Sequence, residues 1–313
     1  MARRLSWHRL AGRHDRRPVS PLTGDGPAGL PIVTSVAGDM VEYRLQRQGH
    51  RTIVVFHGGH MRAGLALGEE VFTSAGFTVL TPSRPGYGRT PLTPATSVAQ
   101  FTDTIAHLCR LQGVDKVAAV VGVSAGGRTA LTMAARHPDL VERVILQSAV
   151  GFDPWPGQWT RLGGRIIFSA GVEAATWAAL RTLLRLAPGA GLRLLMRELS
   201  VIPARQVVGG LSPEARAGLT ELFRAMRSGR GFIADMDPVP DCAAAVTQPV
   251  LIIASRRDRS VPFTHAQSLA TALPHAQLEE SHADSHLIWF DTDYPRTSAR
   301  IGAFLTDRLD GQG

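Results

Sequence analysis

The chain has 313 residues, of which 44% are hydrophobic and 19% are charged. This composition is typical of a folded globular protein and excludes a chain that is disordered throughout. The formal net charge is +8, and much of it comes from an arginine-rich N-terminus, without any recognisable nucleic-acid-binding signature. We therefore expect no nucleic-acid partner for the folded part of the chain.

The first 30 residues predict a basic N-terminal extension that is flexible. Leu5, Trp7 and Leu10 add a slight apolar stripe to its arginines, a pattern also compatible with binding to an anionic membrane or a nucleic acid. We favour a solvated tail, the common behaviour of charged termini. The segment lacks the 7–15-residue apolar run of a secretory signal, so we expect a cytoplasmic protein.

From residue 31 onward, short β-branched runs alternate with helical patterns, which predicts a parallel sheet covered by helices. The predicted strands, in chain order, are 52–56, 77–80, 117–121, 144–146, 249–254 and 276–279. The predicted helices cover 62–75, 98–111, 125–136, 264–273 and 294–308. The order indicates one α/β domain built from residues 31–152 and 246–313.

Residues 153–245 interrupt this rhythm with helix after helix and no convincing strand, which predicts an inserted helical cap. Trp177, Leu180 and Leu184 are spaced for one apolar face. Charged residues interrupt the most apolar stretch, 164–196, so we expect no transmembrane segment. Cys109 and Cys242 form neither a disulfide framework nor a metal-ligand cluster, and we expect no metal and no cofactor.

The sharpest motif is Gly122-Val123-Ser124-Ala125-Gly126, which follows the predicted strand 117–121 and opens the predicted helix 125–136. A tight strand-to-helix turn strains the serine backbone and leaves little room two residues before and after it, where glycine stands. The turn exposes the hydroxyl at the carboxyl edge of the sheet, where open α/β folds bind ligands. Ser124 is therefore the candidate nucleophile.

A serine nucleophile needs a base and a carboxylate that orients the base. Asp258 and His286 each follow a predicted strand, so both are expected at the edge that carries Ser124. His282 competes with His286; we favour His286 because the apolar run at 287–289 directly after it would lock its loop. Asp153 is the alternative acid, although a turn aspartate before proline has commonly a structural role.

Acyl transfer also needs hydrogen-bond donors where negative charge develops. We expect the backbone N–H groups of Gly59 and Ala125 to form this oxyanion hole. His57 is expected to hydrogen-bond its own loop, and His60 is left open as a residue lining the pocket.

Five segments together resemble α/β-hydrolase-fold enzymes of the esterase and epoxide-hydrolase-like branch, over residues 31–308. They are residues 57–59, 83–90, the Ser124 motif, Asp258 with Val261-Pro262, and 285–289. The resemblance implies a mostly parallel eight-stranded sheet, a helical cap and a triad that needs no cofactor. Serine at residue 124, where epoxide hydrolases and haloalkane dehalogenases carry aspartate, disfavours those two chemistries.

The predicted function is therefore ester-like hydrolysis through an acyl-enzyme, on a small-molecule substrate with a hydrophobic body such as an ester, lactone or thioester. Carbon–carbon bond hydrolysis and aminopeptidase chemistry remain alternatives on the same scaffold. A catalytically silent protein that binds a small molecule is a third. The sequence carries no signal for the oligomeric state.

Overall fold

The computed structural model describes residues 30–157, 168–169 and 171–307 of the 313 residues. The predicted N-terminal extension, except for Leu30, lies outside this part of the chain. Eight strands form one sheet, as expected, and their order is β1-β2-β4-β3-β5-β6-β7-β8. Strand β2 runs antiparallel to its neighbours β1 and β4, and all the other neighbouring pairs are parallel. The strands are β1 (Ile32–Val36), β2 (Asp39–Gln46), β3 (Thr52–Phe56), β4 (Thr78–Pro82), β5 (Val117–Val123), β6 (Val144–Gln147), β7 (Val250–Ser255) and β8 (Ala276–Ser281).

Both faces of the sheet are covered, so its central strands are apolar along their whole length. In β3, Ile53 and Val55 belong to one hydrophobic cluster, whereas Val54 and Phe56 belong to another on the opposite face. The first cluster includes residues of α1 and α11, and the second includes residues of α2, α3 and α10. These core helices are α1 (Glu70–Ser74), α2 (Val98–Leu111), α3 (Gly126–Arg136), α10 (Phe263–Ala272) and α11 (Tyr294–Thr306).

The predicted helix at 62–75 is wrong over most of its length, because only Glu70–Ser74 is helical. The buried Arg44 guanidinium accounts for part of this difference: its Nε donates to the Ala63 carbonyl at 2.8 Å. Gly68 adopts a φ of +68°, and a Cβ there would lie 2.2 Å from the Trp289 ring. The loop backbone therefore bonds to a side chain and packs closely against another loop instead of continuing a helix.

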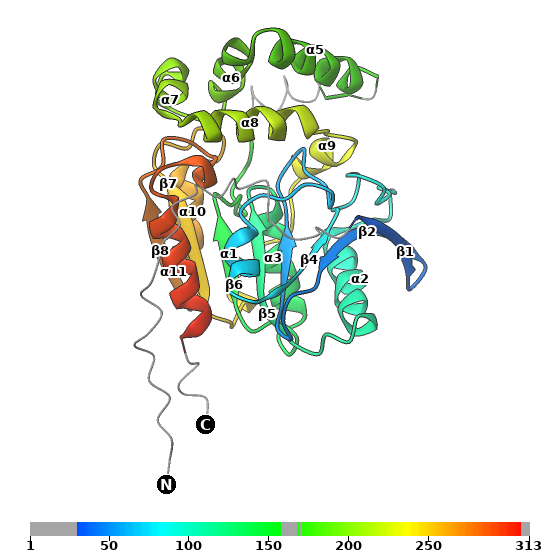
Figure 1. The fold of residues 1–313 in the computed structure, drawn as a ribbon. Coiled ribbons are helices and arrows are strands. Elements are labelled where there is room, and N and C mark those ends of the chain that lie inside the picture. Colours follow the sequence, from blue (N-terminus) through cyan, green and yellow to red (C-terminus); the bar gives the residue numbers. More distant parts are fainter. Residues whose placement is uncertain (1–29, 158–167, 170, 308–313) are drawn as a thin grey trace.

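A helical insertion lies between β6 and β7, and Figure 1 shows its helices above one edge of the sheet. Its apolar residues, including Trp177, Leu184 and Leu222, join the hydrophobic cluster that contains α1 and α11. None of the helices in the described ranges is long and apolar enough to cross a membrane. The insertion comprises α5 (Glu173–Leu186), α6 (Pro188–Met196), α7 (Ala204–Gly210), α8 (Pro213–Ala225), α9 (Gly231–Asp235) and the 3-10 turn η1 (Ala243–Ala245).

Candidate active site

Ser124 lies in a sharp turn between the end of β5 and the start of α3. Its φ is +50°, a left-handed conformation that costs energy for any residue with a side chain. A Cβ added at Gly122 would lie 2.6 Å from the Gly127 Cα, and one at Gly126 would lie 2.1 Å from the Phe56 carbonyl oxygen. The two glycines of the motif are therefore required by close backbone packing around the strained serine.

Asp258 and His286 form a buried, hydrogen-bonded pair. His286 Nδ1 lies 2.6 Å from Asp258 Oδ2, and the two side chains are only 8% and 1% exposed. The other carboxylate oxygen, Oδ1, accepts from the Val261 N–H at 2.9 Å. With Nδ1 facing the carboxylate, Nε2 is the ring nitrogen left to exchange a proton with another group.

The strand ends place this pair on the sheet edge that carries Ser124. The Ser124 N–H donates to the Gln147 carbonyl at the end of β6, and the next residue, Ser148, donates through its hydroxyl to the His286 carbonyl at 3.0 Å. Within the described residues, no hydrogen bond joins the Ser124 hydroxyl to His286. The structure thus pairs the predicted acid with the predicted base and connects the Ser124 turn to the loop of His286. In the described part of the chain, the Ser124–His286 hydrogen bond of a complete triad is not formed.

The helical insertion holds the loops of this pair. Ser200 forms a single antiparallel β-bridge with Asp258, and the His286 N–H donates to the Leu199 carbonyl at 2.8 Å. On the core side, Trp289 Nε1 donates to Gln147 Oε1 at 2.8 Å. This last bond anchors the apolar run after His286. No sequence motif indicates that Leu199 and Ser200 contact these loops. The contacts are visible only in the folded structure.

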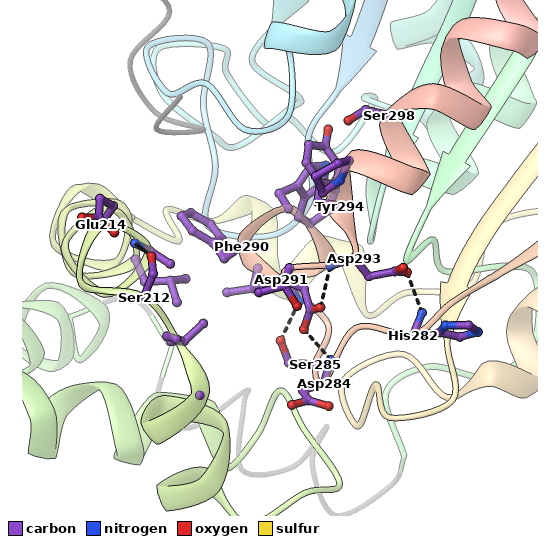
Figure 2. Close-up of a pocket in the computed structure, with 18 of the residues that line it drawn as sticks. Ser212, Glu214, His282, Asp284, Ser285, Phe290, Asp291, Asp293, Tyr294 and Ser298 are labelled. Atoms are coloured by element: carbon purple, nitrogen blue, oxygen red, sulfur yellow. Dashed lines mark hydrogen bonds between the residues drawn. The ribbon is translucent and has the colours of Figure 1, made fainter. Parts of the chain in front are cut away.

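The rival base His282 lies outside this pair. Its side chain is exposed, and Figure 2 shows its N–H bonded to Asp293 beside a groove of about 1080 Å³. Ser285 and Leu287, on either side of His286, line this groove, but Ser124 does not. This groove therefore lies beside the loop that carries His286 and does not include Ser124.

The rival acid Asp153 is also exposed, and its backbone carbonyl accepts from Arg128 at 3.0 Å. Neither His282 nor Asp153 shares in the buried hydrogen bond between Asp258 and His286. The geometry therefore favours the Asp258–His286 pair over both rivals.

The turn at residues 57–59 (the 57–59 turn) packs directly against Ser124. A Cβ added at Gly58 would lie 2.7 Å from the Ser124 Cβ and 3.3 Å from its hydroxyl oxygen. The backbone N–H of Gly59 follows in this turn, and that of Ala125 follows Ser124 in the chain. The two backbone segments expected to donate to an oxyanion therefore meet at the serine.

A network inside the core fixes the side chain of His57. His57 Nε2 lies 2.8 Å from Glu69 Oε1, and Arg44 Nη2 lies 2.6 Å from Glu69 Oε2. Burial alone would raise the pKa of the Glu69 carboxyl, but the hydrogen bond with His57 and the charge of Arg44 outweigh burial and lower it. Glu69 is therefore a buried anion that holds two basic side chains, which matches a structural role for His57.

His60 sits where the core meets the helical insertion. Its ring lies against Phe168, Trp177 and Phe232, with centroids 4.9, 5.3 and 4.1 Å away. Nδ1 is 2.7 Å from the Ser228 hydroxyl. Burial lowers the pKa of His60 to about 4, so the ring is neutral at physiological pH. Because its Nδ1 bonds to Ser228, His60 joins the core to the helical insertion.

No group of three or more histidine, cysteine, aspartate or glutamate side chains in the described ranges is arranged to hold a metal ion. Cys109 and Cys242 are both free thiols, and burial raises the pKa of Cys109 to about 12.

Comparison with known proteins shows what this chain is similar to. The family model described as the alpha/beta hydrolase fold matches residues 47–194. An uncharacterized hydrolase, YcgS of Bacillus subtilis, is 28% identical over 274 residues, covering 86% of this chain and 95% of the relative. An alpha/beta hydrolase fold protein from Nakamurella multipartita superimposes with a TM-score of 0.73 at 22% identity, over 88% of this chain and 98% of that one. The chain is a hydrolase of the α/β-hydrolase fold.

A relative whose name states an activity matches a shorter part of this chain. The pimeloyl-[acyl-carrier protein] methyl ester esterase of Aromatoleum aromaticum is 29% identical over 235 residues, covering 69% of this chain and 85% of the relative. The segment matched by the family model contains Gly59 and Ser124 but ends before Asp258 and His286. The assignment of Asp258 and His286 as the candidate acid and base is therefore supported by the geometry of the loops after β7 and β8, and not by the family model.

Proposed function

We propose that this hydrolase cleaves a carboxylic ester-like bond, in a small or medium ester, lactone or thioester, through an acyl-enzyme on Ser124. The observation that carries the proposal is the buried Asp258–His286 hydrogen bond of 2.6 Å at the sheet edge of the strained Ser124 turn. The similarity to a methyl ester esterase supports the ester class.

In the proposed first step, His286 Nε2 takes the proton of the Ser124 hydroxyl while the serine oxygen attacks the substrate carbonyl carbon. Asp258 stabilises the imidazolium that forms, and the N–H groups of Gly59 and Ala125 donate to the developing oxyanion. Collapse of the intermediate expels the alcohol or thiol, which takes the proton from His286. Apo structures commonly hold such a serine–histidine contact long, and we infer that it shortens when substrate fills the site.

The acyl-enzyme is then hydrolysed. His286 takes a proton from a water molecule, whose oxygen attacks the ester carbon, and Ser124 leaves with the proton returned by His286. We propose that residues 153–245 act as a cap that selects the substrate. A largely apolar helical cap over a polar site favours substrates with a hydrophobic body. The cytoplasmic location stays a prediction.

A substrate panel tests this proposal. We expect wild type to hydrolyse p-nitrophenyl and methyl esters, lactones or thioesters, and Ser124→Ala to lose at least about 10⁴-fold in turnover, since triad residues act as a unit. Ser74→Ala, at the exposed end of helix α1, is the matched control and keeps the wild-type rate. Equal rates for Ser124→Ala and wild type would exclude the acyl-enzyme. Turnover of dipeptides or of vinylogous diketones alone would replace the ester class by one of the alternatives.

A further inference from the structure

Asp235, the last residue of α9 in the helical insertion, binds two side chains of the loop after β4. Arg84 holds the carboxylate with both terminal nitrogens: Nη1 bonds to Oδ1, and Nη2 bonds to Oδ2 at 2.7 Å. The Tyr87 hydroxyl donates to Oδ2 at 2.5 Å. Arg84 and Tyr87 are buried, 6% and 1% exposed, and the Asp235 side chain is 10% exposed. The structure thus contains a charged contact between insertion and core that is shielded from water.

The same guanidinium reaches the 57–59 turn. Arg84 Nε donates to the His57 carbonyl at 2.7 Å. A Cβ added at Gly126 would lie 2.7 Å from that carbonyl oxygen, so it also packs against the turn that carries Ala125. The His57 carbonyl oxygen, which accepts from Arg84, therefore lies where the 57–59 turn packs against the turn that carries Ala125.

Helix α9 packs closely on this part of the core. The Gly231 N–H donates to the Gly86 carbonyl at 3.2 Å, and a Cβ at Gly231 would lie 2.3 Å from the Tyr87 ring. A Cβ at Gly59 would lie 2.9 Å from the Phe232 ring. When Asp235 is bound to Arg84, α9 therefore covers the residue assigned as oxyanion donor.

We propose that Asp235 is a positioning residue for the oxyanion hole: by fixing the Arg84 guanidinium, it sets the His57–Gly58 peptide and, through it, the orientation of the adjoining Gly58–Gly59 peptide that bears the Gly59 N–H. The inference rests on the function proposed above. Asp235 belongs to α9 of the insertion. The insertion therefore takes part in the chemical step through Arg84, without contact between Asp235 and the reacting atoms.

The geometry of arginine explains the coupling. The guanidinium is planar and rigid, so a carboxylate that binds both terminal nitrogens also fixes the direction of Nε. Without the carboxylate, the buried cation turns toward other acceptors and the His57 carbonyl loses its donor. Removal of an oxyanion donor costs about 10²–10³ in kcat, and a displaced donor costs less. We expect Asp235→Asn to lower kcat about 10–100-fold.

The experiment compares Asp235→Asn, Arg84→Lys and wild type with p-nitrophenyl butyrate as the probe ester. Arg84→Lys keeps a positive charge near Asp235 but has no Nε to donate to the His57 carbonyl. Both variants should lose kcat with KM changed less than about threefold, because the lost interaction acts in the transition state. Asp103→Asn is the matched control: it breaks another two-bond arginine–aspartate contact, with Arg136 on the surface, and should keep the wild-type kcat.

A second readout separates positioning from cap stability. Diethyl p-nitrophenyl phosphate leaves a phosphoryl group on a reactive serine, and its oxygen would occupy the oxyanion hole. The ³¹P resonance of this adduct should shift in Asp235→Asn and Arg84→Lys relative to wild type and Asp103→Asn. If Asp235→Asn fails to fold, Arg84→Lys tests the inference alone. A lower kcat together with a shifted ³¹P resonance supports it, and wild-type values of both overturn it.

The possible failures are distinct. A raised KM with unchanged kcat and an unshifted ³¹P resonance would overturn the inference and reduce Asp235 to an attachment of the insertion. A wild-type protein that forms no adduct on Ser124 would instead overturn the proposed function. Normal adduct formation in all variants with equal kcat would remove only the role of Asp235.

Discussion

Two arginine–carboxylate contacts meet at His57, and they come from different regions of the molecule. The His57 side chain bonds to Glu69, which is paired with Arg44, and all three residues belong to the sheet and its loops. The His57 carbonyl bonds to Arg84, which is paired with Asp235 from the helical insertion. The first contact forms with the core itself, whereas the second forms only when the insertion docks.

This difference indicates a division of tasks at the 57–59 turn. The core contact bonds to the side chain of His57, so we expect it to stabilise the fold of the turn. The insertion contact bonds to the His57 carbonyl, so we expect it to affect the proposed oxyanion hole. The comparison therefore predicts stability effects on the core side and kinetic effects on the insertion side.

The largest effect on stability is expected for Glu69→Gln. The change leaves the Arg44 cation buried without its partner, and breaking a buried ion pair in this way costs about 3–5 kcal/mol. The free energy of unfolding at pH 7, from urea titration of the purified protein, is the measurement. If the variant were as stable as wild type, the core contact would not be needed to hold the 57–59 turn.

The neighbouring residue supplies the control. Burial raises the pKa of the Glu70 carboxyl to about 7, so this group is partly neutral at pH 7, unlike Glu69. Glu70→Gln should therefore raise the free energy of unfolding at that pH, opposite in sign to Glu69→Gln, because the unfolded chain ionises a carboxyl that the folded chain keeps partly neutral. Equal losses for the two variants would indicate a general sensitivity of this loop and not a specific ion pair.

A smaller effect, which depends on pH, is expected at His60, where core and insertion meet. Its pKa falls from 6.5 to about 4 on folding because the ring is buried, so the unfolded chain binds the additional proton between those values. Stability from this group is complete above pH 6.5 and is lost as the pH falls toward 4, by on the order of 2–3 kcal/mol.

His60→Asn should flatten this loss. Asparagine tolerates the φ of +66° found at residue 60 and does not titrate in this range. Unfolding free energies of wild type and variant, measured at half-unit steps from pH 7 to pH 4, give the two slopes. Parallel slopes would show that His60 is not buried as a neutral ring.

The fold was largely predictable from the sequence because its central strands are buried on both faces and read as apolar runs. The predicted strand at 52–56 matches β3, and that at 117–121 lacks only the last two residues of β5. The antiparallel strands β1 and β2 were not assigned residue ranges. They lie toward one edge of the sheet, where Ile32 is 50% exposed, so their sequences lack a continuous apolar run.

The site was predictable where the chemistry requires particular residues at a strand end. The motif around Ser124 and the positions of Asp258 and His286 after strands follow from local sequence and topology. Asp235 was not predictable, because a lone aspartate in a helical segment carries no signal for an arginine 151 residues away. The contacts of Leu199 and Ser200 with the acid–base loops depend in the same way on how the insertion docks.

Covalent labelling with a fluorophosphonate, followed by intact-mass measurement, tests the central claim most directly. The account predicts a single adduct on the wild-type protein, located by peptide mapping on Ser124, and no adduct on Ser124→Ala over the same time. Labelling of Ser124→Ala as fast as wild type would contradict it, and so would a wild-type protein that stays unlabelled.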